Sequence, residues 1–306
     1  MHPAPSIIIF TTLSGMGYGL ATILGLGLLD PGAAATKVAH VLALAMIAGG
    51  LLSSTLHLGN PQRAWRALSQ WRSSWLSREG AMSLATFVPL TLSAWFAVIE
   101  GRYVPTLGLL GAAMCAATVY CTAMIYASLR AVQAWNTQLT PLCYLLFAAA
   151  GGLTLTTVFA ASSGNSAWLP GILAIVAIAA AWIAKNLWWT RQRTLVPLST
   201  PESATGLGNI GRVRLFERPH VNDNYLTREM GFKVARKHAV KLSNLAMIAG
   251  GAVPIALLAI AAFSGAGAVA IVASALAAAC CTLGIVVERW LFFAEARHAV
   301  MNFYGG

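Results

Sequence analysis

The feature that most constrains this chain is a series of eight long apolar segments. A helix needs roughly 20 apolar residues to cross the hydrocarbon core of a bilayer, and each segment has about that length. The segments are Ile7–Leu29, Val38–Leu58, Ala81–Ile99, Val104–Leu129, Leu142–Ala161, Trp168–Trp189, Leu242–Phe263 and Gly265–Val287. The sequence therefore predicts an all-α polytopic membrane protein, in which residues 1–306 form one bundle of eight transmembrane helices.

Charged residues make up only 9% of the chain, and their distribution predicts its orientation. If the eight spans are correct, both termini and the even-numbered loops share one side. That side carries 18 of the 20 Lys and Arg residues, and the split is still 8 to 2 without residues 191–241. Such an excess is typical of cytoplasmic loops. We expect a bacterial inner-membrane protein with cytoplasmic termini, and the net charge of +11 does not indicate a nucleic-acid partner.

The five cysteines do not suggest a metal site. Cys115, Cys121, Cys143, Cys280 and Cys281 all fall within predicted spans and form no Cys-x-x-Cys pair. Zinc and iron–sulfur sites usually contain such pairs, so we expect that this chain binds no metal.

Two loops on the basic side are longer than a helix connection requires. Gly59–Gly80 carries four arginines and three tryptophans, and residues 190–241 form a long loop with charges of both signs. A long loop beside a membrane usually has a function. We expect the 190–241 loop to contact a soluble partner subunit.

Ionisable residues near the spans gather at that same side. His57 ends the second span, Glu79 begins the third, and Glu288 and His298 lie at or after the end of the eighth. A membrane quinone needs hydrogen-bond donors and a proton route where lipid meets water, and a histidine with a neighbouring carboxylate can supply both. The residues alone leave a second interpretation open, in which His57 and Glu79 only interact favourably with the dipoles of the helix ends on which they lie.

The motifs resemble a known family, the membrane anchor subunit of dimethyl sulfoxide reductase and of related sulfite-oxidising molybdoenzymes. The resemblance rests on His57-Leu-Gly-Asn-Pro-Gln-Arg63-Ala-Trp-Arg66, Leu76-Ser-Arg-Glu79, Tyr126-Ala-Ser, Thr140-Pro141, and Glu288-Arg289 followed by Phe292, Phe293 and His298. The 190–241 loop looks more like that of the sulfite-oxidising branch.

The resemblance implies a complex of three subunits. Partner subunits would carry the molybdopterin and the iron–sulfur clusters, and this chain would exchange their electrons with menaquinone or ubiquinone. It would hold no cofactor covalently and contribute no catalytic residue for the sulfur compound. The resemblance implies these roles at the quinone site: His57 bonding the head group, Gly59 permitting a close turn, Arg63 holding negative charge and Glu79 passing protons, with Tyr126, Glu288 and His298 as neighbours.

Three alternatives remain open from the sequence. The same anchor could serve a dimethyl sulfoxide reductase that oxidises quinol. A b-type haem anchor is a second alternative, although His40 and His57 lie 17 residues apart, roughly 25 Å along a helix, and cannot bind one haem together. A transporter is the third, but its site would lie near the bilayer midplane.

Overall fold

The computed structural model describes residues 3–56, 59–214, 216–217 and 234–303. Within these ranges all regular structure is helical, which confirms the predicted fold class, and eight helical segments are long and apolar enough to cross a membrane. They are α1 (Pro5–Gly25), α2 (Ala34–Thr55), α3 (Trp75–Ile99), α4 (Pro105–Ala127), α5 (Leu139–Ser162), α6 (Trp168–Arg193), the run α9 (Val234–Met247), η2 (Ile248–Ala252) and α10 (Val253–Phe263), and α11 (Ala268–Ala294).

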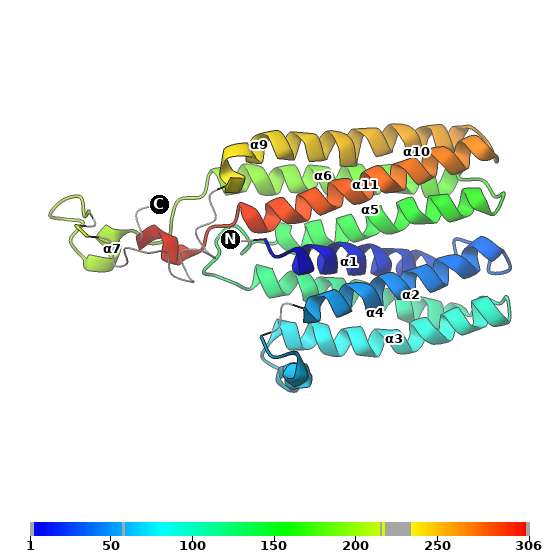
Figure 1. Ribbon diagram of the computed structural model, residues 1–306, viewed down its shortest axis with the longest axis horizontal. Coiled ribbons are helices and arrows are strands. Elements are labelled where there is room, and N and C mark those ends of the chain that lie inside the picture. The colour runs from blue at the N-terminus through cyan, green and yellow to red at the C-terminus, as the bar shows by residue number, and fades with distance from the viewer. Residues whose placement is uncertain (1–2, 57–58, 215, 218–233, 304–306) are drawn as a thin grey trace.

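The spans form one bundle with helix α1 at its centre. Helix α1 packs against α2, α4, α5 and α11. Helix α3 packs mainly against α4, and helix α6 packs mainly against α5 and α10. Both chain ends lie at one end of the bundle, and short loops close the other (Figure 1). We call the end with the termini the basic end, because it carries most of the arginines.

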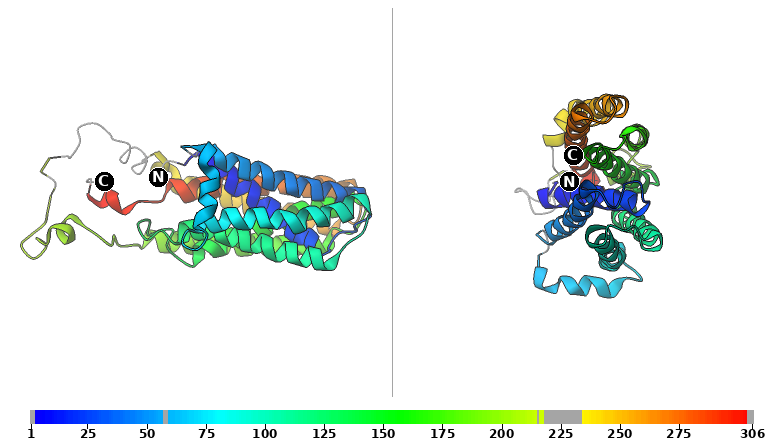
Figure 2. Two further views of the ribbon diagram at one scale, coloured as in Figure 1. Left: turned by 90° about the horizontal axis from the view of Figure 1, so that it is seen from below. Right: turned by 90° about the vertical axis from the view of Figure 1, so that its right-hand side faces the viewer.

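The two long loops contain more helix than the apolar segments predicted. Helix α3 begins at Trp75 because the Ser74 hydroxyl accepts a hydrogen bond from the Ser77 backbone N–H, and so Glu79 lies inside the helix. Ahead of it, the 3₁₀ helix η1 (Pro61–Gln70) runs roughly perpendicular to the transmembrane helices, at the edge of the bundle near its basic end (Figure 2). Helix α6 extends to Arg193 and α9 begins at Val234, so the second loop is shorter than 190–241.

Small residues allow close packing at the centre of the bundle. Gly19 of α1 faces Gly152 and the carbonyl of Ala148 on α5, so a methyl group at Gly19 would overlap that carbonyl. Close approach of backbones is a main source of helix association in lipid. Gly15, four residues earlier in α1, has no such contact.

A π-helical turn interrupts the seventh span for a local reason. Pro254 has no N–H to donate to the carbonyl of Gly250, four residues earlier. The indole Nε1 of Trp182 on α6 donates to that carbonyl instead, at 2.9 Å. A side chain of a neighbouring helix therefore supplies a donor to a carbonyl whose usual donor four residues later is missing.

Candidate functional site

A pocket of about 510 Å³ lies at the basic end, bounded by α1, α2, η1, α3 and α4. Its lining is predominantly apolar. It consists of Ile7, Phe10, Leu51, Ser54, Thr55, Ala64, Trp65, Ala67, Leu68, Leu76, Glu79, Gly80, Ser83, Leu84, Ile125 and Tyr126. A volume in the range of about 300–1,000 Å³ with few polar groups is typical of small-molecule sites.

Helix η1 forms one wall of this pocket and has a strongly two-sided sequence. Ala64, Trp65, Ala67 and Leu68 line the cavity, whereas Arg66 is exposed and lies over the Trp65 ring, 5.5 Å from its centroid. A short helix with apolar residues on one side and arginines on the other suits the interface between lipid and water. The sequence of η1 thus favours a position of the pocket near the lipid–water interface.

Among the described lining residues, Glu79 is the one acidic side chain. It is only 6% exposed, and the described residues offer it no cation within ion-pair distance. Its polar contact is with Ser83, one turn later: the Ser83 hydroxyl donates to the Glu79 carbonyl at 2.8 Å and lies 3.5 Å from Oε1. A buried carboxyl without a counter-charge binds a proton readily, which suits it to accept and release one.

Tyr126 joins the pocket to a buried aromatic cluster. Its ring stacks on Tyr144 at 5.8 Å between centroids and meets Trp135, Phe292 and Phe293 edge to face at 5.3–5.6 Å. The Trp135 indole donates to the carbonyl of Phe292 at 3.0 Å, which ties the loop after α4 to α11. Tyr126 is thus held rigidly at the inner wall of the pocket.

A second buried charge site lies on the other side of that aromatic cluster. Lys185 Nζ lies 2.6 Å from Glu288 Oε1, and Arg289 Nε lies 2.7 Å from Glu288 Oε2, with all three side chains at most 2% exposed. Lys185 also sits over the Trp188 ring and Arg289 over the Tyr144 ring, each 3.9 Å from the centroid. We call Lys185, Glu288 and Arg289 the ion cluster.

The structure brings together only some of the predicted site residues. Glu79 and Tyr126 line the pocket. His57 lies outside the described residues, although Thr55, two positions earlier, is in the pocket wall. Arg63 is exposed on η1 next to the lining residue Ala64. Gly59 is exposed, and open space surrounds it, so the structure shows no steric need for glycine there.

Two predicted neighbours lie elsewhere. Glu288 is enclosed in the ion cluster, and His298, whose Nδ1 accepts from the Val300 N–H at 3.2 Å, lies beyond α11; neither lines the pocket. They lie apart from Glu79 because nearness to the same membrane face does not place helices side by side. Glu295, which follows α11, accepts a hydrogen bond from Trp189 Nε1 at 3.0 Å, and burial raises its pKa.

The sequence contained signals for two residues that the site prediction missed. Ser83 stands four positions after Glu79, the spacing that places two side chains on one helix face. Lys185 stands inside an otherwise apolar span, where an ionisable group is expected to have a buried partner. Its partner proves to be Glu288.

The comparisons agree with this architecture. Residues 1–203 match the model of the DMSO reductase anchor subunit (DmsC) family. The chain belongs to this family. It is 31% identical to a sulfite dehydrogenase subunit of Allochromatium vinosum over 99% of both proteins. It is also 32% identical to an anaerobic dimethyl sulfoxide reductase chain of Haemophilus influenzae, over 39% of this protein and 43% of that one. The protein is thus a multi-pass anchor subunit of this family.

Proposed function

We propose that this anchor exchanges electrons between an iron–sulfur partner subunit and the membrane quinone pool, and that the pocket beside Glu79 binds the quinone head group. The observation that carries the proposal is the pocket itself, an apolar cavity of about 510 Å³ at the basic end whose described lining residues include one buried carboxyl. The tail of a quinone suits the apolar lining, and its head group needs a proton partner.

The residues of the anchor then have distinct roles. Glu79 takes up or releases a proton at its carboxyl, and Ser83 holds that carboxyl in place. Trp65 and Leu68 close the pocket on the η1 side and exclude water. His57 follows the lining residue Thr55 in sequence and donates a hydrogen bond to a head-group carbonyl. Arg63, adjacent to Ala64, provides positive charge at the mouth of the pocket.

The partner subunits supply the remaining chemistry. Iron–sulfur clusters in one partner subunit would supply or accept single electrons at the pocket, and a molybdopterin subunit would convert the sulfur compound. We place these subunits on the basic end of the anchor, at the cytoplasmic face of the bacterial inner membrane. The arginines on this side support that orientation.

We favour sulfite oxidation coupled to quinone reduction over the reverse process with dimethyl sulfoxide. The similarity to the sulfite dehydrogenase relative extends over nearly the whole protein, whereas the similarity to the dimethyl sulfoxide reductase relative extends over 39% of it. The purified complex should therefore reduce quinone with sulfite. Quinol oxidation by dimethyl sulfoxide, without sulfite activity, would favour the second function, and a haem Soret band from this anchor would contradict both.

The residue-level test is His57→Ala in the complete complex. We expect the complex to assemble normally and to lose quinone-linked turnover, while oxidation of sulfite with an artificial acceptor continues. His40→Ala is the matched control, because His40 lies near the start of α2, away from the basic end, and this variant should keep full activity. Normal quinone turnover in His57→Ala would refute the site.

A further inference from the structure

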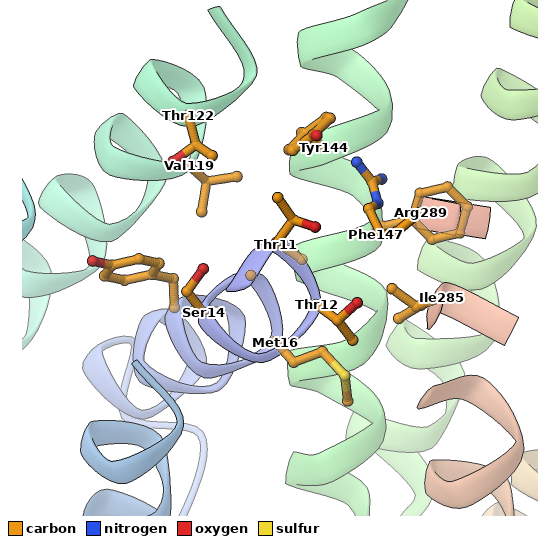
Figure 3. Close-up of a pocket in the computed structure, with 13 residues that line it drawn as sticks. Thr11, Thr12, Ser14, Met16, Val119, Thr122, Tyr144, Phe147, Ile285 and Arg289 are labelled. Carbon is orange, nitrogen blue, oxygen red and sulfur yellow. The ribbon is translucent and has the colours of Figure 1, made fainter. Parts of the chain in front are cut away.

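A small cavity lies inside the bundle and shares no described lining residue with the quinone pocket. Its volume is about 20 Å³, and it is bounded by α1, α4, α5 and α11. Figure 3 shows Thr12 of α1, Tyr144 of α5 and Arg289 of α11 around it. One water molecule needs roughly 10–15 Å³ of such space. The cavity therefore has room for one species of about that size and excludes larger molecules.

Four buried residues at this cavity carry polar atoms that need a partner. Among the described residues, the structure shows no hydrogen-bond partner for these atoms: Thr12 Oγ1, Tyr18 OH, Tyr144 OH and the two terminal nitrogens of Arg289. Each of the four residues is at most 5% exposed, and all line the cavity. A guanidinium nitrogen can only donate hydrogen bonds, and a hydroxyl can donate one. The cavity therefore presents several buried donors that lack an acceptor.

Other hydroxyls in the same wall do have acceptors. Thr11, Ser14 and Thr122 each donate to the carbonyl four residues earlier in their own helix, at 2.6–3.1 Å. Such bonds are the usual way for a hydroxyl inside a helix to be satisfied. The unpartnered donors are thus particular to the residues that lie beside Arg289 in the cavity wall.

The ion cluster has an excess of positive charge. Lys185 and Arg289 share the single carboxylate of Glu288, at 2.6 Å and 2.7 Å. Glu295 bonds to Trp189 and, in the described structure, lies beyond ion-pair distance of both cations. A buried charge without compensation is costly, and in a low-dielectric interior it attracts an ion of opposite sign strongly. Because Arg289 also lines the cavity, this attraction acts on whatever occupies it.

We propose that the cavity binds one chloride ion, held by the guanidinium of Arg289 and by the hydroxyls of Tyr144 and Thr12. A halide accepts hydrogen bonds from several directions and is only slightly larger than a water molecule, whereas phosphate and sulfate exceed the cavity. The ion balances the excess charge of the ion cluster and links α1, α5 and α11. It can be enclosed when these helices associate, so the site needs no open channel. The site is independent of the proposed quinone function.

The test uses bromide, which resembles chloride in size and has a strong anomalous X-ray signal. The complete complex is produced and purified with bromide in place of chloride. X-ray fluorescence should find one firmly held bromide ion in each wild-type anchor, and an anomalous difference map should place it beside Arg289 and Tyr144. A series of bromide concentrations during purification gives the affinity.

Lys185→Met separates the effect of charge from that of shape. Lys185 belongs to the ion cluster but does not line the cavity, so the variant removes the excess charge and leaves the walls unchanged. Because the attraction between charges is strong in a low-dielectric interior, we expect the affinity for bromide to fall roughly tenfold or more. Equal bromide content in this variant and in wild type would overturn the proposal.

Tyr144→Phe tests the coordination, because it removes one donor and keeps the ring over which Arg289 lies. A hydrogen bond to a charged group is strong enough that its loss should lower bromide affinity about tenfold. Tyr103→Phe is the matched control, since Tyr103 donates to the Gly25 carbonyl away from the basic end, and it should retain bromide as wild type does.

If Tyr144→Phe fails to assemble, Thr12→Val removes another donor at nearly equal volume and should show the same loss. A water molecule in the cavity of the bromide-treated wild-type complex, or bromide only at surface positions, would overturn the anion site. Quinone turnover is not part of these readouts, so such a result would leave the proposed function standing.

Discussion

Two buried carboxyls at the basic end have opposite surroundings. Glu288 contacts both Lys185 and Arg289 and is sealed by aromatic rings, whereas Glu79 has Ser83 and an apolar pocket of about 510 Å³. A paired charge in a closed site holds helices together, and an unpaired carboxyl in an open site is available to a ligand. The sequence places both carboxyls at the same depth, but their surroundings suit Glu288 to a structural role and Glu79 to a chemical one.

Glu288→Gln should have the largest effect. It leaves Lys185 and Arg289 buried without a counter-charge, and loss of one partner of a buried pair costs about 3–5 kcal/mol. We expect a large fall in the thermal stability of the detergent-purified complex, or failure to assemble. Lys185→Met is the control, because it leaves the Arg289–Glu288 pair intact and should destabilise the protein less. Equal stability of Glu288→Gln and wild type would remove the structural role of the ion cluster.

Glu79→Gln should show the opposite behaviour. No cation lies within ion-pair distance of Glu79 in the described structure, so the amide should leave the melting temperature nearly unchanged. Loss of a positioned proton-transfer group should reduce quinone turnover by about 100-fold or more. Turnover and thermal unfolding should be measured on the same preparation, and a variant that loses both together would show that Glu79 is structural.

Trp65→Ala should have a smaller effect, confined to the pocket. Trp65 forms part of the η1 wall, and its loss should weaken quinone binding by about tenfold, which corresponds to 1.4 kcal/mol. Steady-state kinetics should show a higher KM with kcat little changed. Trp71 lies in the same basic loop and is also exposed, but it does not line the pocket, so Trp71→Ala serves as the matched control. Similar KM values for the two variants would mean that η1 does not bound the site.

Trp182→Phe should give the smallest change and tests whether charge, rather than burial, explains the effect at Glu288. The variant removes a neutral hydrogen bond to the Gly250 carbonyl, which contributes about 1 kcal/mol. We expect a small fall in melting temperature with normal quinone turnover. A fall in melting temperature as large as that of Glu288→Gln would indicate that a neutral buried hydrogen bond of α6 contributes as much stability as the ion cluster.

The sequence predicted the fold better than the site. Runs of about 20 apolar residues are enough to locate spans, because every backbone polar group in lipid must be satisfied within a helix. The position of Glu79 near the start of α3 followed from the same pattern. Which helices meet depends on side-chain packing, such as Gly19 against α5, and a linear pattern does not contain it. The sequence therefore did not show that Glu288 lies apart from Glu79 or that it pairs with Lys185.

The most direct test of the central claim is photoaffinity labelling of the complete complex in its native membrane with an azidoquinone, followed by mass spectrometry of the labelled peptides. We predict labels within the pocket wall, on residues of η1 and of the first turns of α3, with competition by unlabelled quinone. Specific labels confined to α5, α6 and α11 around the ion cluster would contradict the account.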